Sequence, residues 1–502
     1  MNRSKALSFL LILLLAAFSL SSCSGIKNQC TTNCTVGGNA TVSFTLVADT
    51  LPANPSILSF KVTIVSIALT PTTGTALTLS ASSAIVDLMR LQSDTAFLGV
   101  LANVPAGTYT VQISLSNPVI TFLNNSPSTI TANGVACLSG AVCTASLTAA
   151  GVPTISSFTF TATSSGLQGI ELDFNLNNAV SISGGTLSVN FNPTTPAVFT
   201  AFTLPRTNAN LSSSQLELIE DFTGVVSISG TTVTITSPVR GTLTATSSSS
   251  SFFDPSPNGL ICPTSTITCV VNGQIASVDA FLNSDGTLSL KEFEPLNTTQ
   301  QDFVEGIVYA VNTPTQLGVV VTDEVQAATN SLITGLNTGD LLTVNLSSQP
   351  FQVDTKGLAV PPASLGLFQG QTDTSAIHLG QTVAVHPTTF VAANGTTIAV
   401  ATVDLVTLRW SRLIASLTGA ATNTLLNVNA VPSYFNVTPA SSFPTQVFSG
   451  TLGAQGVTNI DGIPNGAGSA NTSLPVGLRV LYLDNTTNSA QFPFMATKIR
   501  QH

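Results

Sequence analysis

The sequence predicts an all-β protein in which an N-terminal β-sandwich is followed by about three small β repeats. Residues 60–69 alternate apolar and polar side chains, which is the pattern of a half-buried strand. The chain is rich in Thr and Val, which favour strands, and in Asn and Gly, which favour turns. A short motif recurs in its second half, and the copies are separated by about the length of a small domain.

The composition limits the class of protein and its partners. The 502-residue chain is 43% hydrophobic, so it can form several cores. Only 7% of its residues are charged, against about 25% in a typical globular protein. Thr, Ser, Asn and Gly must therefore cover most of the surface. The net charge of −9 is thinly spread without a basic patch, so we expect no nucleic-acid partner.

The chain begins with an export signal. Arg3 and Lys5 precede an apolar stretch at 6–20, which is shorter than the roughly 20 residues of a membrane-spanning helix. Leu20-Ser21-Ser22-Cys23 then resembles the cleavage box of bacterial lipoproteins, in which the cysteine is acylated. We predict a signal peptide at 1–22, lipidation of Cys23 and a flexible tether at 23–39. The alternative is an ordinary signal peptide followed by an unmodified cysteine.

The lipoprotein resemblance also implies a location. A lipid on Cys23 would anchor the protein to a membrane of the cell envelope. In Gram-negative lipoproteins an Asp after the lipidated cysteine favours retention in the inner membrane. Ser24 stands there instead, so we expect the outer membrane rather than the inner membrane.

The seven cysteines become an even set once Cys23 is lipidated. An exported protein lies where disulfides persist, and the other six fall into pairs that are close in sequence. We predict three small disulfide loops, although other connectivities are open: Cys30 with Cys34, Cys137 with Cys143, and Cys262 with Cys269. A zinc site is the rival interpretation, but the spacings are not those of zinc ligands and the histidines are distant in sequence.

The sandwich is expected at 40–205. Strands are predicted at 60–69, 84–88, 104–115, 155–163, 169–176 and 184–191, with a helical turn or two within 87–101. Short strands separated by turn signals at this spacing are typical of a sandwich.

This segment resembles an uncharacterised domain family of bacterial lipoproteins with a transthyretin-like or immunoglobulin-like sandwich. The residues that carry the resemblance are the strand at 60–69, Val86-Asp87-Leu88, Val104-Pro105-Ala106-Gly107-Thr108-Tyr109 and Glu171-Leu172-Asp173-Phe174-Asn175-Leu176. The resemblance implies a fold and a location, and no activity.

The second half contains a degenerate repeat. Asp221-Phe222-Thr223-Gly224 opens one copy and Asp302-Phe303-Val304-Glu305-Gly306 opens the next. Gly273-Gln274, Gly380-Gln381 and, more loosely, Gly477 begin the closing strands. We predict units at 217–297, 300–409 and 411–501, the third opening near either Gly419 or Gly450. They resemble an uncharacterised repeat of bacterial surface proteins, which implies that each copy is a small β-barrel.

The search for catalytic motifs finds no nucleophile elbow, P-loop or His-Glu-x-x-His pattern. Asn283-Ser284-Asp285-Gly286 with Glu292 and Glu294 has some features of a calcium loop, but Phe281 would occupy the first ligand position. We interpret this segment as a hairpin with both glutamates in solvent. The glycine-rich segment 462–468 lacks the lysine of a phosphate-binding loop.

Three further groups are candidates for chemistry. Glu220-Asp221 and Asp323-Glu324 are interpreted as solubilising charges at strand ends, because neighbours in a strand point to opposite faces. His378 and His386 could meet Asp373 or Asp404 in a metal site, although they lack a third ligand. Trp410, flanked by Arg409 and Arg412, could stack on a sugar, but we expect it to pack between two repeats.

No residue is therefore assigned to catalysis, to a cofactor or to a metal. We expect a lipid-anchored envelope protein with a non-enzymatic binding, adhesion or structural role, whose ligand is a glycan or an envelope protein. The alternative is a carbohydrate-acting hydrolase, or an accessory to one, with carboxylates contributed by different repeats.

Overall fold

The computed structural model describes the chain in segments. They cover residues 39–48, 56–79, 84–148, 154–164, 166–192, 197–206, 211–255, 262–395, 397–429, 431–435, 443–450, 456–483 and 492–501. The predicted signal peptide, Cys23 and the tether up to residue 38 lie outside the described residues.

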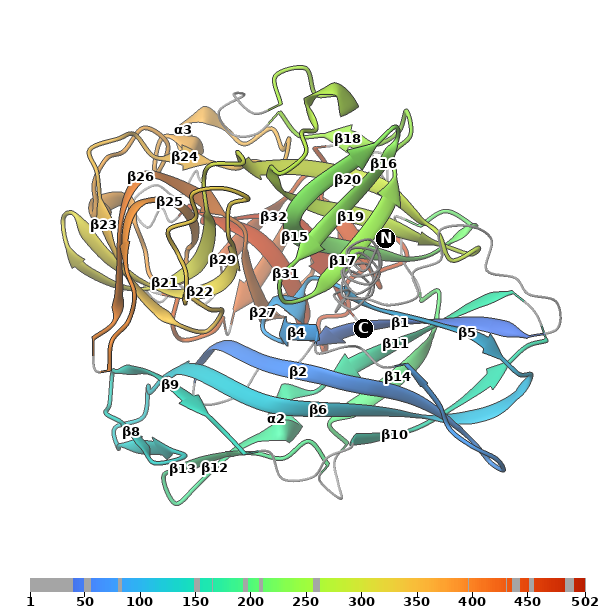
Figure 1. Ribbon diagram of the computed structural model, residues 1–502. Coiled ribbons are helices and arrows are strands. Elements are labelled where there is room, and N and C mark those ends of the chain that lie inside the picture. Colours follow the sequence, from blue (N-terminus) through green and yellow to red (C-terminus); the bar gives the residue numbers. More distant parts are fainter. Residues whose placement is uncertain are drawn as a thin grey trace, which may run out of the picture.

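The prediction of an all-β fold is confirmed. The helices of the described residues are single turns: α2 (Leu176–Ala179), α3 (Pro362–Leu365), and the 3₁₀ turns η1 (Arg90–Gln92), η2 (Ile267–Cys269), η3 (Thr374–Ala376) and η4 (Ala467–Ser469). Among these residues no helix is long and apolar enough to span a membrane. The strands form a sandwich, at the bottom of Figure 1, and three barrels above it.

The N-terminal unit consists of two larger sheets and one small sheet. Their strand orders are β14-β11-β1-β5, β10-β6-β2-β3 with β4 and β9 attached, and β12-β13-β7-β8. The strands are β1 (Ala40–Ala48), β2 (Ser56–Pro71), β3 (Leu77–Leu79), β4 (Ala84–Asp87), β5 (Ala96–Val104), β6 (Gly107–Leu123), β7 (Ile130–Ala132), β8 (Val135–Cys137), β9 (Val142–Ser146), β10 (Thr154–Ala162), β11 (Leu167–Phe174), β12 (Val180–Ser183), β13 (Thr186–Val189) and β14 (Phe199–Leu204).

The alternation seen in the sequence builds the sandwich core. In β2, Phe60, Val62 and Ile64 are fully buried, whereas Lys61 and Thr63 between them are partly exposed. The ring of Phe60 lies 5.9 Å from that of Phe174 in β11, so the two larger sheets share one core. Fully burying such side chains stabilises the fold by about 1.5–3 kcal/mol each.

Three closed sheets follow, which we name barrels A, B and C. Their strand orders are β17-β16-β15-β19-β20-β18, β23-β22-β21-β25-β26-β24 and β29-β28-β27-β31-β32-β30. The strands are β15 (Gln215–Ser229), β16 (Thr232–Ser237), β17 (Gly241–Thr246), β18 (Phe252–Phe253), β19 (Ile275–Asn283) and β20 (Leu288–Asn297) in A; β21 (Phe303–Thr313), β22 (Gln316–Val325), β23 (Leu341–Leu346), β24 (Gln352–Val353), β25 (Thr382–Val391) and β26 (Ala399–Arg409) in B; and β27 (Ser411–Leu417), β28 (Leu425–Asn429), β29 (Phe443–Val447), β30 (Asn459–Asp461), β31 (Val476–Tyr482) and β32 (Phe494–Arg500) in C.

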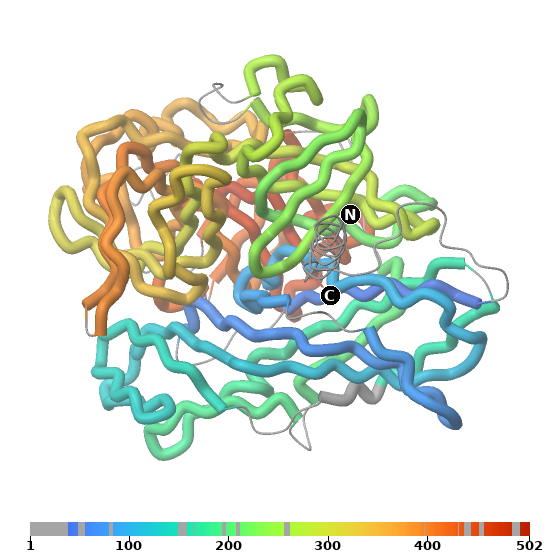
Figure 2. The backbone as a smooth tube through the Cα atoms, in the orientation of Figure 1, coloured from blue at the N-terminus to red at the C-terminus, as the bar shows by residue number. Residues whose placement is uncertain are grey.

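Each barrel closes through the same pairing. The third long strand runs parallel to the fifth, as β17 does to β20, β23 to β26 and β29 to β32. Five strands in the order 1-2-3-5-4-1 have the topology of an OB-fold barrel. The three barrels follow one another through green, yellow-orange and red in Figure 2, above the blue and teal sandwich.

The glycines of the repeat motif lie where the first strand of a barrel touches the second. A Cβ on Gly224 would lie 2.4 Å from the carbonyl oxygen of Thr236, and one on Gly306 would lie 2.6 Å from that of Val320. A side chain at either position would therefore collide with the backbone. In barrel C the first strand begins at Ser411, so Gly419 and Gly450 both lie beyond it.

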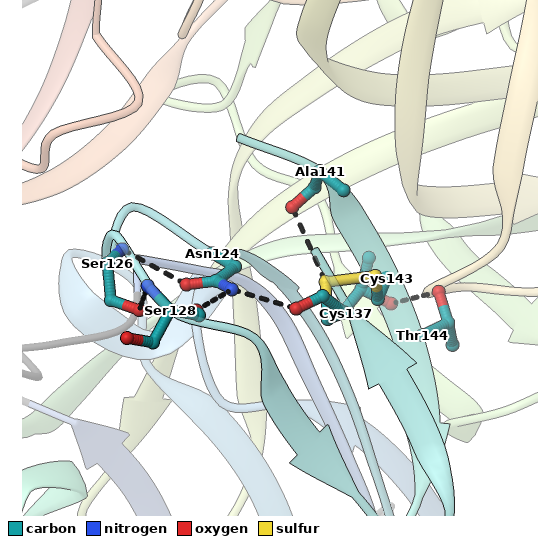
Figure 3. The surroundings of a disulfide bond; sticks show 8 residues. Asn124, Ser126, Ser128, Cys137, Ala141, Cys143 and Thr144 are labelled. Atoms are coloured by element: carbon teal, nitrogen blue, oxygen red, sulfur yellow. Dashed lines mark hydrogen bonds between the residues drawn. A yellow bond between two sulfur atoms is a disulfide. The ribbon is translucent and has the colours of Figure 1, made fainter. Parts of the chain in front are cut away.

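Two of the predicted disulfides are present. Cys137 at the end of β8 is joined to Cys143 in β9, and Cys262 is joined to Cys269 in the segment before β19. Figure 3 shows the first of them, beside Asn124, whose side-chain amide donates to the carbonyl oxygen of Cys137 at 2.8 Å. Both disulfides close short surface segments. The predicted pair Cys30 and Cys34 lies outside the described residues.

Candidate functional site

The last strand of each barrel carries polar side chains at two matched positions. The register is given by the short strands β18, β24 and β30, which run parallel to β20, β26 and β32. Through this register, Glu292 and Glu294 of barrel A correspond to Thr407 and Arg409 of barrel B and to Lys498 and Arg500 of barrel C.

An aspartate stands at the same place in all three short strands. Asp254 follows β18, Asp354 follows β24 and Asp461 ends β30, and each residue is at most 5% exposed. Each lies one register position beyond the paired apolar residue, Phe253, Val353 or Ile460. The repeat therefore brings a carboxyl group to the inner end of each barrel.

The sandwich sends one segment between the barrels. Residues 88–95, which we call the plug, leave β4, include η1 and are all less than 9% exposed. Figure 1 shows this blue segment reaching up from the sandwich towards β27 and β31. Arg500 of barrel C donates hydrogen bonds to the backbone carbonyl oxygens of Leu91 and Asp94 in the plug, the latter at 3.0 Å. The plug is therefore part of the interior of the barrel assembly.

Charged side chains of the plug pair with two barrels. Arg90 Nη1 lies 2.9 Å from Asp323 Oδ2 and 3.4 Å from Glu305 Oε1, both in barrel B. Asp94 accepts from Arg412 of barrel C, and its other oxygen lies 3.7 Å from Arg479 Nη1. We call the whole set of buried ionic groups between the plug and the barrels the junction.

The side chain of Asp221 in barrel A pairs with three cationic groups of the junction. It accepts from Arg412, from Arg479 at 2.8 Å and from Lys356 at 3.4 Å. A bulge in β15 and a left-handed backbone, with φ 47°, place it outside the regular ladder. Burial alone would raise the pKa of this carboxyl, but Lys356, Arg479 and Arg412 hold it well below its usual value.

Arg409 of barrel B joins carboxylates of two barrels. It pairs with both oxygens of Glu294, with Asp354 and, through Nε at 3.2 Å, with Glu305. Trp410 Nε1 donates to Asp354 at 3.2 Å. Burial would raise the pKa of Glu294, but Arg409 and Lys356 lower it to about 2. Burial and the neighbouring Glu294 raise the pKa of Asp354, which favours its neutral form.

Carboxyl groups outnumber basic groups in the junction. The basic residues are Arg90, Arg240, Lys291, Lys356, Arg409, Arg412, Arg479, Lys498 and Arg500. The carboxyl groups are Asp94, Glu217, Glu220, Asp221, Asp279, Glu292, Glu294, Glu305, Asp323, Asp354 and Asp461. Burial accordingly raises the pKa of Glu217, Glu220 and Glu292, which favours their neutral forms.

Two expectations about these carboxylates are wrong. Glu294 is 1% exposed and Glu292 has a half-buried side chain paired with Lys356, so neither glutamate extends freely into solvent. Glu220, Asp221 and Asp323 are likewise buried and paired, rather than solubilising charges at strand ends. These strand ends point into the junction, where charges from other modules compensate them.

Glu324, the neighbour of Asp323, is also buried but lies at the sandwich side of barrel B. Its carboxylate accepts from Thr338 Oγ1 at 2.7 Å. Burial raises its pKa to about 8. The prediction that this residue is a solvated strand-end charge is therefore wrong as well.

The segment with features of a calcium loop is the hairpin between β19 and β20. Asp285 Oδ1 accepts from the backbone N–H and the hydroxyl of Thr287, and Gly286 has φ 85°. This is a self-contained turn in which the side chain of Asp285 bonds its own backbone. Across the described residues, no cluster of three or more His, Cys, Asp or Glu side chains has the geometry of a metal site.

The two histidines do not form one site with both candidate aspartates. His386 Nδ1 lies 3.9 Å from Asp404 Oδ1, while its other ring nitrogen contacts Asn297. His378 packs near Tyr482, with 6.0 Å between ring centroids. Burial lowers the pKa of His386, which favours the neutral ring. Asp373 instead caps η3 by accepting from Ser375 N.

A pocket of about 310 Å³ lies between the sandwich and barrel C. It is lined by Arg206, Gly462, Ile463, Pro464, Ser469, Asn471, Leu474 and Gln501. Arg206 is 2.6 Å from Glu171 and stacks over the ring of Phe202 at 3.7 Å. The glycine-rich segment at 462–468 thus supplies one wall of this pocket.

The expected position of Trp410 agrees with the structure. Trp410 is 2% exposed and follows the last strand of barrel B, directly before the first strand of barrel C. Sequence reasoning missed Asp94, Asp254, Asp354 and Asp461. The signal for the last three was the aspartate that directly follows an apolar residue in each repeat, as in Phe253-Asp254, Val353-Asp354 and Ile460-Asp461.

The junction connects the sandwich plug to the three barrels through side chains that are mostly buried. Comparison of the chain with protein-family models, curated proteins and solved structures found no significant match.

Proposed function

We propose that the protein is a lipid-anchored component of the cell envelope with a non-enzymatic binding or structural role. The observation that carries the proposal is the distribution of charge. Of the basic residues in the described segments, all except Lys61 form ion pairs or buried hydrogen bonds, most of them in the junction. The charged side chains of this protein mainly connect its modules to one another.

The burial of the converging carboxylates argues against the hydrolase alternative. A glycosidase needs two carboxyl groups on either side of a bond in the sugar. Asp221, Glu294, Glu305, Asp354 and Asp461 do come from different barrels, but each is at most 5% exposed and paired with arginine or lysine. A sugar would have to separate the modules to reach them.

The outer face of barrel A is the surface best suited to a neutral ligand. Cross-strand neighbours on β16 and β17 are both threonines: Thr232 opposite Thr246, Thr234 opposite Thr244, and Thr236 opposite Thr242. Ser227 and Ser229 of β15 extend this array. The hydroxyl groups are partly or fully exposed, and OB-fold barrels commonly bind oligosaccharides on the face of their second and third strands.

Binding to glycans tests this role. Purified protein should retain a glycan from an envelope-polysaccharide array, and Thr234→Val with Thr244→Val should weaken retention at least several-fold because two hydroxyl groups are lost. Thr343→Val on β23 of barrel B is the matched control and should bind normally. Turnover of a polysaccharide that a junction carboxylate variant abolishes would instead establish the hydrolase.

The anchor has its own test. Cys23→Ser should abolish incorporation of a labelled fatty acid and release the protein from the membrane fraction, since the acyl chains supply the membrane affinity. Unchanged labelling of the variant would rule out lipidation at Cys23.

A further inference from the structure

Lys498 and Glu220 meet at the contact between barrels A and C. Lys498 lies on the last strand of barrel C and Glu220 on the first strand of barrel A. The Lys498 ammonium donates to Glu220 Oε2, and the two side chains are 1% and 0% exposed. An amine nitrogen and a carboxyl group are thus held together in a site without access to bulk water.

Two more charged groups surround this pair. Asp461 Oδ2 lies 3.7 Å from Lys498 Nζ. Arg479 Nη2 lies 3.7 Å from Glu220 Oε1, an oxygen without a hydrogen-bond partner in the described structure. A second carboxylate beside the amine can carry protons, and a guanidinium beside the free oxygen can stabilise negative charge that develops on it.

The site favours condensation over a lasting ion pair. Each ion buried in a dry interior costs several kcal/mol, whereas an amide removes both charges at once. Holding the reacting groups in contact also replaces a bimolecular encounter, and effective molarities for well-oriented pairs reach about 10⁵ M or more.

We propose that Lys498 and Glu220 condense into an isopeptide bond that links barrel C covalently to barrel A. Lys498 Nζ, after passing a proton to Asp461, attacks Glu220 Cδ, and a C–N bond forms while Arg479 stabilises the oxyanion on Oε1. The bond from Cδ to Oε2 then breaks. Of the three ammonium protons, one stays on the amide nitrogen. The other two, one of them delivered by Asp461, leave with Oε2 as water, so Asp461 regains its starting form and no oxidant or reductant is required.

The bond would link barrels A and C, which are not consecutive in the sequence. Barrels A and B, and B and C, are consecutive in sequence, but Glu220 and Lys498 are separated by 278 residues. A covalent link there makes a ring of the three barrels around the plug. It would hold the junction together when the envelope protein is pulled or partly unfolded.

The other lysines of the junction lack this arrangement. Lys356 lies 3.4 Å or more from the carboxylates of Asp221, Glu292 and Glu294. Asp221 also pairs with Arg412, and Glu294 also pairs with Arg409. Lys291 is 3.8 Å from Asp279, with a side chain that is 15% exposed. Lys356→Arg is therefore a matched control that keeps a buried charge in the junction.

Peptide mapping of the purified full chain decides the question. After reduction, alkylation and digestion, we expect one branched peptide that contains both Glu220 and Lys498, lighter than its two parts by one water molecule and uncut by trypsin after Lys498. The same peptide should persist in Lys356→Arg and be absent from Lys498→Arg. Separate, unmodified peptides from the wild-type protein would overturn the proposal, and this measurement depends on no variant.

Asp461→Asn tests the assigned proton carrier. The variant keeps the lysine and the glutamate in place but removes the base, so the branched peptide should fall at least tenfold in yield. Full yield from a folded Asp461→Asn protein would overturn the role of Asp461. If the variant does not fold, Asp461→Glu is made instead, because it keeps a carboxylate near Lys498. The branched peptide should form in this variant, and its absence from a folded Asp461→Glu protein would contradict the role of Asp461.

Discussion

Barrels A and B place opposite charges at the same position of the same strand. Glu294 on β20 corresponds to Arg409 on β26, and the two side chains pair with each other across the barrel contact. In barrel C the matched position holds Arg500, which instead binds backbone carbonyls of the plug. The three barrels therefore share the same arrangement of strands but differ in the charges at matched positions. These charge differences specify how each barrel packs against the plug and its neighbours.

A second contrast separates the junction from the outer face of barrel A. Charged side chains usually lie on the surface and hydroxyls take either environment. Here the junction collects the charges, while Thr236 and Thr246 face solvent. Because buried ion pairs tolerate little misplacement, the charges specify assembly and the neutral surface remains available for a ligand.

The largest expected effect comes from removing the charge that joins barrels A and B. Arg409→Met leaves Glu294, Asp354 and Glu305 without their shared cation and should cost about 3–5 kcal/mol of unfolding free energy, measured by denaturant titration. Lys61→Met is the control, because Lys61 is partly exposed and forms no ion pair within the described segments. It should cost about 0.5 kcal/mol or less. Equal losses would contradict the special role of the junction.

A smaller effect should appear in the pH dependence of the unfolding free energy, through Glu324 at the edge between barrel B and the sandwich. Glu324 faces Thr338, Asp323, Lys61 and Asp340, and its pKa is raised from 4.5 to about 8. A raised pKa means that the folded state holds the proton more tightly. This stabilisation is complete below about pH 4.5 and is lost as pH rises through 8.

Glu324→Gln measures this contribution. The amide keeps a hydrogen-bonding group but does not ionise, so wild type should lose stability relative to the variant between pH 5 and pH 8 or higher. Thermal unfolding at a series of pH values gives the difference. Parallel curves for wild type and Glu324→Gln would contradict the raised pKa.

The smallest of the three effects concerns the contact between the plug and barrel C. A Cβ on Gly477 would lie 2.2 Å from the carbonyl oxygen of Gln92. Gly477→Ala should therefore shift the plug and destabilise the protein by about 1–3 kcal/mol. Gly107→Ala is the control, because its Cβ would lie 3.7 Å from the nearest atom of Tyr109. Faster hydrogen exchange at residues 88–95 in Gly477→Ala alone would locate the change.

Much of the fold could be predicted because its signals are local. The alternation in 60–69 depends on neighbours within one strand, and β2 extends over that range. Gly224 and Gly306 marked the repeat because each first strand has to pass close to the backbone of the second. The disulfide between Cys137 and Cys143 joins residues only six positions apart.

The junction could not be predicted in the same way. Glu220 and Asp221 look like surface charges when only their neighbours in sequence are considered, since an unpaired charge is rarely buried. Their partners are remote: Arg412 lies 191 positions from Asp221, and Lys498 lies 278 positions from Glu220. The repeated aspartates were visible, but without the strand register nothing related Asp354 to Arg409.

The sequence by itself determined the all-β class, the repeated motif and the local cysteine pairs, because strand periodicity, turn chemistry and short loops are encoded over a few residues. The tertiary structure alone decided which carboxylates are buried and which modules they join. An ionic group can leave water only when a compensating charge arrives from elsewhere in the chain, and that depends on the packing of four modules around residues 88–95.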